Sequence, residues 1–228
     1  MKYNVILFDA DGTLFDFHKA EEIAFQKAIE NINTAISFTD LFNTYLEENH
    51  KIWRELERGQ ITQEKLKIER FERFIDKSGI SADAQTLANT FMSTLSETSI
   101  LYEDALNIVK QISHQNTVAI ITNGLKEVQG KRVRNSVLKS YVKTTVISDE
   151  LGIQKPDPRI IDHTLDLLGH KTKNDVVIIG DSLTSDIQGG INAGIDTIWY
   201  NPTNKENHQN ISPTYTIKTL SQLLSTLK

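Results

Sequence analysis

The chain has 228 residues, a formal net charge of -5 and a pI near 5.7. This length predicts one compact domain with a modest insertion, and the acidic charge argues against a protein that binds nucleic-acid phosphates through general electrostatics. The sequence contains no cysteine, which excludes disulfides, thiolate zinc sites and cysteine nucleophiles.

The first apolar run covers only residues 5–8, which is too short for a signal peptide or a membrane span. We therefore expect no membrane association and a cytoplasmic location. The same run is β-branched and aromatic and stops at Asp9, so it predicts a fully buried strand.

The segment 17–96 contains no comparable β run. Its apolar residues, such as Ile52 and Leu56, recur with helical spacing, and turn-forming residues interrupt the pattern near Gly59 and Gly79. The segment therefore predicts an all-helical insertion of about four helices after the first strand.

The remainder of the chain alternates strand-like and helical patterns. The strand-like runs are 118–121, 176–179 and 197–200, and the helical patterns are 103–113, 125–138 and 159–168. This alternation predicts an α/β fold, a Rossmann-like parallel sheet core flanked by helices. We assign residues 1–16 and 97–228 to this core and residues 17–96 to the helical domain.

Polar residues follow three of the predicted strands. Asp9, Thr122 and Asp181 each come directly after a buried run. Because ligands of such sheets bind beyond the carboxyl ends of the strands, we expect these three distant segments to meet at one site.

The segment 9–13 reads DADGT, with two carboxylates two residues apart. In an extended segment Asp9 and Asp11 project to one side, where their repulsion favours a divalent cation, and oxygen ligands favour magnesium. A carboxylate can attack phosphorus and form an acyl phosphate, which is the role we predict for Asp9. Asp11 would protonate the leaving alcohol and then deprotonate the hydrolytic water. The alternative is an ordinary Asp-Gly turn after a strand.

Four segments together resemble the phosphatases of the haloacid dehalogenase superfamily across the whole core. They are DADGTL at 9–14, ITNG at 121–124, KPDP at 155–158 and GDSLTSD at 180–186. The resemblance implies that Asp9 is the nucleophile and Asp11 the acid–base, and that the backbone carbonyl of Asp11 also binds Mg²⁺.

The second and third segments are expected to hold the phosphate. Thr122, with Asn123 and neighbouring backbone N–H groups, matches the family's phosphate-binding turn, although Thr122 or Asn123 could simply cap the following helix. Lys155 matches the lysine that offsets the charge of Asp9 and the phosphoryl oxygens, although a single lysine before proline is ordinarily a surface residue.

The fourth segment is expected to complete the magnesium site. Asp181 is positioned as a metal ligand, and Asp186 would support the site or bind the metal through water. Asp186 could instead stabilise the first turn of a helix. Elsewhere, Lys131, Arg132 and Arg134 form the nearest approach to a basic patch, which we interpret as a solvated helix face.

The insertion corresponds to the family's helical cap, which closes over the site and selects the substrate. Segments within 51–74 and 186–201 are similar to the bacterial pyrimidine nucleotidase branch, which implies a small-molecule substrate, a nucleoside 5'-monophosphate with a pyrimidine base. Trp53 or Phe17 could stack on a base, but an aromatic residue on a helical cap more often belongs to a core.

Several alternatives stay open at this point. A sugar-phosphate phosphatase or phosphomutase would use the same core chemistry, and a non-catalytic interaction protein is a remote alternative because all four segments are intact. The presence of Asp11 argues against dehalogenation, since dehalogenases of the superfamily do not need this second aspartate. The oligomeric state is not determined by the sequence.

Overall fold

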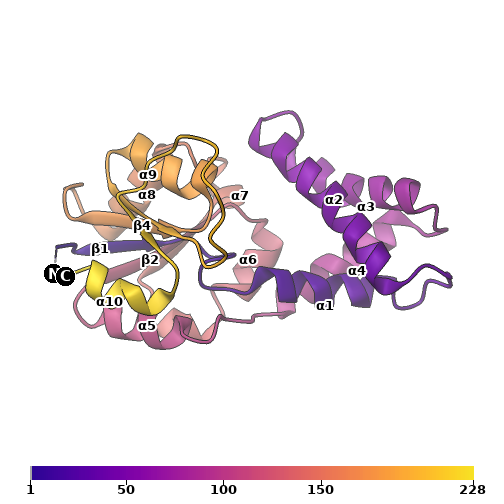
Figure 1. Ribbon diagram of the computed structural model, residues 1–228, viewed down its shortest axis with the longest axis horizontal. Coiled ribbons are helices and arrows are strands. Elements are labelled where there is room, and N and C mark those ends of the chain that lie inside the picture. Colours follow the sequence, from indigo (N-terminus) through magenta and orange to yellow (C-terminus); the bar gives the residue numbers. More distant parts are fainter. Residues whose placement is uncertain (1) are drawn as a thin grey trace. The chain divides into compact units, whose positions relative to one another are not determined.

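The computed structural model describes residues 2–228 (Figure 1). The chain divides into two compact units, Met1–Phe17 with Ser99–Lys228, and His18–Thr98. The first unit contains a six-stranded sheet with the order β3-β2-β1-β4-β5-β6. The second unit is built from helices.

All neighbouring strands of the sheet are parallel, as the alternating pattern predicted. The strands are β1 (Val5–Phe8), β2 (Thr117–Thr122), β3 (Thr144–Ile147), β4 (Val176–Gly180), β5 (Asp196–Tyr200) and β6 (Tyr215–Ile217). β1 is central, because Val5 is in register with both Thr117 and Val176. The carboxyl ends of β1, β2 and β4 therefore lie side by side.

Both faces of the sheet are covered, which explains why its central strands are apolar throughout. Ile6 and Phe8 face one core together with residues of α5 (Ala105–Ser113) and α10 (Leu223–Thr226). Val5 and Leu7 face the other core. That second core also contains residues of α8 (Arg159–Leu168) and α9 (Gln188–Ala193). Figure 1 shows these two pairs of helices on opposite sides of the sheet.

The predicted helix over residues 125–138 is wrong in its extent. α6 is only Lys126–Arg132, and a separate 3₁₀ turn follows at Val137–Ser140. The hydroxyl of Ser136 accepts a hydrogen bond from the amide of Leu138, so a new turn is capped there. Two further short helices of this unit are α7 (Ser148–Leu151) and a 3₁₀ helix at Leu220–Gln222.

The second unit contains the four helices that the sequence predicted. They are α1 (Phe17–Ile29), α2 (Phe38–Glu57), α3 (Gln63–Ser78) and α4 (Ala84–Glu97), the first of which begins at the last residue of the other unit. The side chains of Ser37, Thr62 and Asp83 each accept a hydrogen bond from a first-turn amide of the helix that follows. Within residues 2–228, no helix is both long and apolar enough to cross a membrane.

Candidate active site

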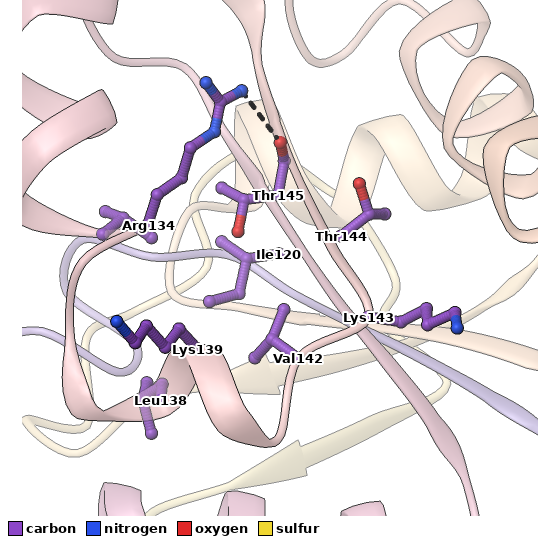
Figure 2. A pocket seen from close by; sticks show the side chains of 9 residues that line it. Ile120, Arg134, Leu138, Lys139, Val142, Lys143, Thr144 and Thr145 are labelled. Carbon is purple, nitrogen blue, oxygen red and sulfur yellow. Dashed lines mark hydrogen bonds between the residues drawn. The ribbon is translucent and has the colours of Figure 1, made fainter.

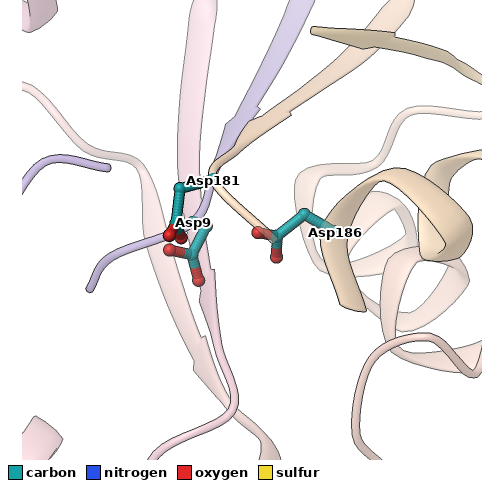
Figure 3. Close-up of side chains that lie close together, drawn as sticks. All are labelled: Asp9, Asp181 and Asp186. Atoms are coloured by element: carbon teal, nitrogen blue, oxygen red, sulfur yellow. The ribbon is translucent and has the colours of Figure 1, made fainter. Parts of the chain in front are cut away.

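Three aspartates gather at the carboxyl ends of the central strands (Figure 3). Asp9 follows β1, Asp181 follows β4, and Asp186 lies in a π-helical turn, Leu183–Ile187. One carboxylate oxygen from each of these aspartates lies within 4.8 Å of the others. The sequence therefore predicted correctly that distant segments converge here.

Gly12 makes room for this arrangement. Its φ of +85° is a conformation that residues with side chains rarely adopt, and an added Cβ would lie 2.8 Å from Cγ of Asp181. The glycine of the DADGT segment thus allows the loop after β1 to pass close against the carboxylate that follows β4.

Lys155 is buried against two of these carboxylates, with 1% of its surface exposed. Its Nζ donates to Asp9 Oδ1 at 2.6 Å, to Asp186 Oδ1 at 2.7 Å and to the carbonyl of Ile121 at 2.8 Å. The alternative of an ordinary surface lysine is therefore wrong. Burial by itself lowers the pKa of Lys155, but the charges of Asp186 and Asp9 outweigh it, so the net pKa is raised and the ammonium stays charged.

The carboxylates carry more negative charge than one lysine neutralises. Burial, followed by the charge of Asp186, holds the pKa of Asp9 well above its usual value, and Lys155 opposes this rise only in part. Burial and Asp186 likewise raise the pKa of Asp181 to about 7. Burial and the mutual repulsion of the carboxylates thus both disfavour the ionised forms of Asp9 and Asp181.

The residues fit a magnesium ion. Asp9 Oδ2 is buried, and among residues 2–228 no group forms a hydrogen bond with it. A buried carboxylate oxygen without a partner is costly, and Mg²⁺ prefers hard oxygen ligands of this kind. Asp9 and Asp181 are therefore the residues that would hold the ion.

Asp186 makes contacts of two kinds. Its Oδ1 accepts from Lys155, and its Oδ2 accepts from the amide of Ser182 at 3.0 Å, at the start of the π-helical turn. Asp186 therefore holds the ammonium group of Lys155 in place and also stabilises the π-helical turn to which Asp186 itself belongs. Both of its oxygens are engaged by the protein, and the binding of the metal by Asp186 through water remains a prediction.

Thr122 and Asn123 lie at the end of β2. The alternative that either residue caps the next helix is wrong, because α6 begins at Lys126 after Leu125. Asn123 instead clamps the main chain of Lys155: its Nδ2 donates to the carbonyl at 2.8 Å, and its Oδ1 accepts from the amide at 2.8 Å. The substrate-binding roles of both residues remain predictions.

Asp11 points to groups that the sequence did not reveal. Its Oδ1 accepts from Nη1 of Arg132, and its Oδ2 accepts from Nε2 of Gln129 at 2.6 Å. The prediction that Arg132 belongs to a solvated face is therefore wrong: the residue is 1% exposed, whereas Lys131 and Arg134 are exposed. Only the three-residue spacing of Gln129 and Arg132 could have hinted that they share a helix face.

The comparisons with known proteins agree with this geometry. A family model described as haloacid dehalogenase-like hydrolase matches residues 3–194. The chain belongs to this family. It is 34% identical over 230 residues to the pyrimidine 5'-nucleotidase PynA of Streptococcus pneumoniae, covering 100% of this chain and 96% of PynA.

Two further relatives span all or nearly all of the chain. The pyrimidine 5'-nucleotidase YjjG of Escherichia coli is 32% identical over 223 residues, covering 98% of this chain and 97% of YjjG. The crystal structure of the Bacillus subtilis HAD-hydrolase YfnB bound to magnesium superimposes with a TM-score of 0.92 at 33% identity, covering 100% of both chains. The haloacid dehalogenase-like fold is confirmed, and the enzyme is a phosphatase of this family.

A separate pocket of this hydrolase, with a volume of about 360 Å³, is lined by none of the three clustered aspartates (Figure 2). Ile120, Leu138 and Val142 line it together with the cations Arg134, Lys139 and Lys143. Arg134 donates to the carbonyl of Thr145 across it at 3.2 Å, as Figure 2 shows. The residues that line this pocket include no carboxylate, so it does not offer the carboxylate nucleophile that the sequence predicts.

Proposed function

We propose that this phosphatase hydrolyses nucleoside 5'-monophosphates, with a preference for pyrimidine bases, through an aspartyl-phosphate on Asp9. The observation that carries the proposal is the state of the Asp9 carboxylate. One of its oxygens is held by Lys155, and the other is buried and without a hydrogen-bond partner among residues 2–228, beside Asp181.

The first half-reaction transfers the phosphoryl group to the protein. An oxygen of Asp9 attacks phosphorus and forms the acyl phosphate bond, while the bond from phosphorus to the 5'-oxygen breaks. Asp11 gives its proton to the departing oxygen, so that the nucleoside leaves as a neutral alcohol. Lys155, which already faces Asp9, offsets the negative charge that accumulates there.

The second half-reaction restores the enzyme. A water molecule attacks phosphorus, the acyl phosphate bond breaks, and Asp11 accepts the proton that the water loses. Asp9 returns to its ionised form and inorganic phosphate departs. Thr122, at the end of β2, would position the phosphoryl group in both half-reactions.

We propose Mg²⁺ as the cofactor, with Asp9, Asp181 and the backbone carbonyl of Asp11 as its ligands and Asp186 as a supporting residue. When bound, the ion would offset the charge of the phosphoryl oxygens. The orphaned Asp9 oxygen and the raised pKa of Asp181 support this assignment.

The substrate class is supported by the names of two relatives, PynA and YjjG, both described as pyrimidine 5'-nucleotidases and both matched over nearly their whole length. In this proposal residues 17–96 form a cap domain that selects the base, and residues 1–16 with 97–228 carry the chemistry. The helical unit His18–Thr98 supplies a compact body for the former role.

Phosphate release from a panel of nucleotides, sugar phosphates and 4-nitrophenyl phosphate tests the proposal, with and without Mg²⁺. We expect release that requires Mg²⁺, is highest with pyrimidine nucleoside 5'-monophosphates, and disappears in Asp9→Asn. A maximum with sugar phosphates would reject the substrate class and retain the mechanism. Activity that persists in Asp9→Asn would reject the mechanism.

A further inference from the structure

A buried hydrogen-bond network joins Asp11 to Thr122. Nε2 of Gln129 donates to Oδ2 of Asp11 at 2.6 Å and to the hydroxyl of Thr122 at 2.8 Å. Nη1 of Arg132 donates to the other Asp11 oxygen, and also to Oε1 of Gln129 at 2.9 Å. Both oxygens of Asp11 are therefore held by two side chains of α6, which lie three residues apart on one face of that helix.

The local structure is shaped around Gln129. The residue is 1% exposed, and a Cβ added at Gly124 would lie 2.4 Å from its Cγ and 2.6 Å from its Nε2. Only a glycine at position 124 leaves the Gln129 side chain its path between Asp11 and Thr122. The glycine after the Thr122-Asn123 pair thus serves the network directly.

Arg132 is fixed from several directions. Its guanidinium lies over the rings of Phe15 and Phe17, at 5.1 and 5.4 Å from their centroids. Its carbonyl accepts a hydrogen bond from the hydroxyl of Ser99 at 2.9 Å. The side chain reaches Asp11 from a rigid position, so the orientation of the carboxyl group is set by the protein.

A network that buries the guanidinium group of Arg132 is an unfavourable way to gain stability alone. Burying a guanidinium costs free energy that its ion pair only partly recovers, and apolar residues of similar volume would pack at least as well. A group that transfers a proton, by contrast, must be aimed at the reacting oxygen, because misplacement by about 1 Å can cost about 100-fold in rate. The hydrogen bonds from Gln129 and Arg132 both end on Asp11, the residue whose carboxyl group must be oriented for proton transfer.

We propose that Gln129 and Arg132 are positioning residues that direct the carboxyl group of Asp11 at the leaving oxygen and hold it at a fixed separation from Thr122. The inference rests on the proposed function, in which Asp11 protonates the departing alcohol. It assigns to α6 a part in catalysis that does not involve contact with the substrate.

The dependence on the leaving group distinguishes this role from a structural one. A nucleoside 5'-oxygen is a poor leaving group and needs the proton of Asp11, whereas 4-nitrophenolate departs without one. For both substrates kcat/KM reports only the steps up to the formation of the phosphoenzyme, so the later role of Asp11 as a base does not enter. General acid catalysis contributes about 100-fold to 10,000-fold in rate.

The test compares Gln129→Met and Arg132→Met with wild type, because methionine keeps much of the length of each side chain. We expect kcat/KM for a nucleoside 5'-monophosphate to fall about 10-fold to 100-fold, mainly through kcat, and kcat/KM for 4-nitrophenyl phosphate to stay within about threefold. Arg132→Lys should restore part of the lost activity. Arg134→Met is the matched control, because Arg134 is exposed and pairs with Glu150, and both values should stay unchanged.

A parallel loss for both substrates in Gln129→Met, or no loss for the nucleotide, would overturn the inference. Gln129→Met decides the matter if Arg132→Met does not fold. Asp11→Asn must show the same selective loss of activity on the nucleotide. If it does not, and Asp9→Asn is inactive, the positioning role is wrong but Asp9 remains the proposed nucleophile.

Discussion

The two units differ in the kinds of side chain that they bury. In the sheet unit, Asp9, Lys155 and Asp186 are buried together at one end of the strands. In the helical unit, the interior is a cluster of aromatic rings in which the Tyr45 ring lies 4.7 Å from that of Phe25 and 5.6 Å from that of Phe91. The sheet unit thus adds a cluster of buried charges to its apolar cores, whereas aromatic rings pack around Tyr45 in the helical unit.

The buried carboxylates of the two units also differ in their partners. In the helical unit, Glu21 accepts hydrogen bonds from Asn49 at 2.7 Å and from the hydroxyl of Tyr45 at 3.2 Å. Burial, assisted by Glu21, raises the pKa of Tyr45, so its hydroxyl remains a donor. Asp9, by contrast, keeps one oxygen that no group of residues 2–228 satisfies. A carboxylate left incomplete by its own fold is the one suited to bind something else.

The largest expected effect comes from the charge site. Asp9→Asn keeps the shape of the side chain and removes the nucleophile, so phosphate release should fall by about four orders of magnitude or more. Because the substitution also removes one of several clustered charges, the melting temperature should not decrease. Activity assays together with thermal unfolding check both statements, and a strongly destabilised variant would contradict the second.

The next effect tests how far the buried carboxylates of the sheet unit depend on Lys155. Lys155→Met should abolish activity and lower the free energy of unfolding by about 3–5 kcal/mol, because Asp9 and Asp186 would lose their buried cation. Denaturant unfolding measures the change. Lys143→Met, which alters an exposed lysine, should leave stability within about 0.5 kcal/mol of wild type. A Lys155→Met protein as stable as wild type would show that the carboxylates do not depend on this ammonium.

Magnesium should stabilise the protein through the sheet unit. At a concentration 100 times its dissociation constant, a bound ion adds about 2.7 kcal/mol to the free energy of unfolding. We therefore expect Mg²⁺ to raise the melting temperature of wild type, and EDTA to reverse the rise. Asp181→Asn should respond much less. Sodium chloride of matched ionic strength is the control. If Mg²⁺ raised the melting temperature of Asp181→Asn as much as that of wild type, the ion would bind elsewhere.

The smallest effect belongs to the aromatic interior. Phe91→Leu removes ring contacts with Tyr45 and Phe71 and should cost about 1–3 kcal/mol of stability. Below its unfolding transition the variant should still hydrolyse 4-nitrophenyl phosphate, because the substitution leaves Asp9 and Lys155 in place. Ile23→Ala, at a half-exposed position of α1, is the matched control and should change stability by less than about 0.5 kcal/mol. If a folded Phe91→Leu protein no longer hydrolysed 4-nitrophenyl phosphate, the proposed division between an aromatic interior that stabilises and a charged site that reacts would be wrong.

The amino-acid sequence by itself determined the elements whose signals are local. A run such as 5–8 is apolar at every position because both faces of β1 are covered, and the glycines near 59 and 79 mark where helices end. Because parallel strands bring their carboxyl ends together, the residues after them, Asp9, Thr122 and Asp181, could also be assigned to one edge. The two edge strands β3 and β6 were missed, since each has only one neighbour and a partly polar sequence.

Only the tertiary structure decided the environment of α6. Asp11 and Arg132 are 121 positions apart, and no local pattern tells whether an arginine in a basic stretch faces water or a carboxylate from another segment. Beyond the end of this helix at Arg132, Val133 and Leu138 belong to the core that also contains Phe8, which the local sequence does not reveal. Burial and charge pairing are properties of the assembled layers, so the partners of Asp11 became visible only when the loop after β1 and the helix α6 were brought together.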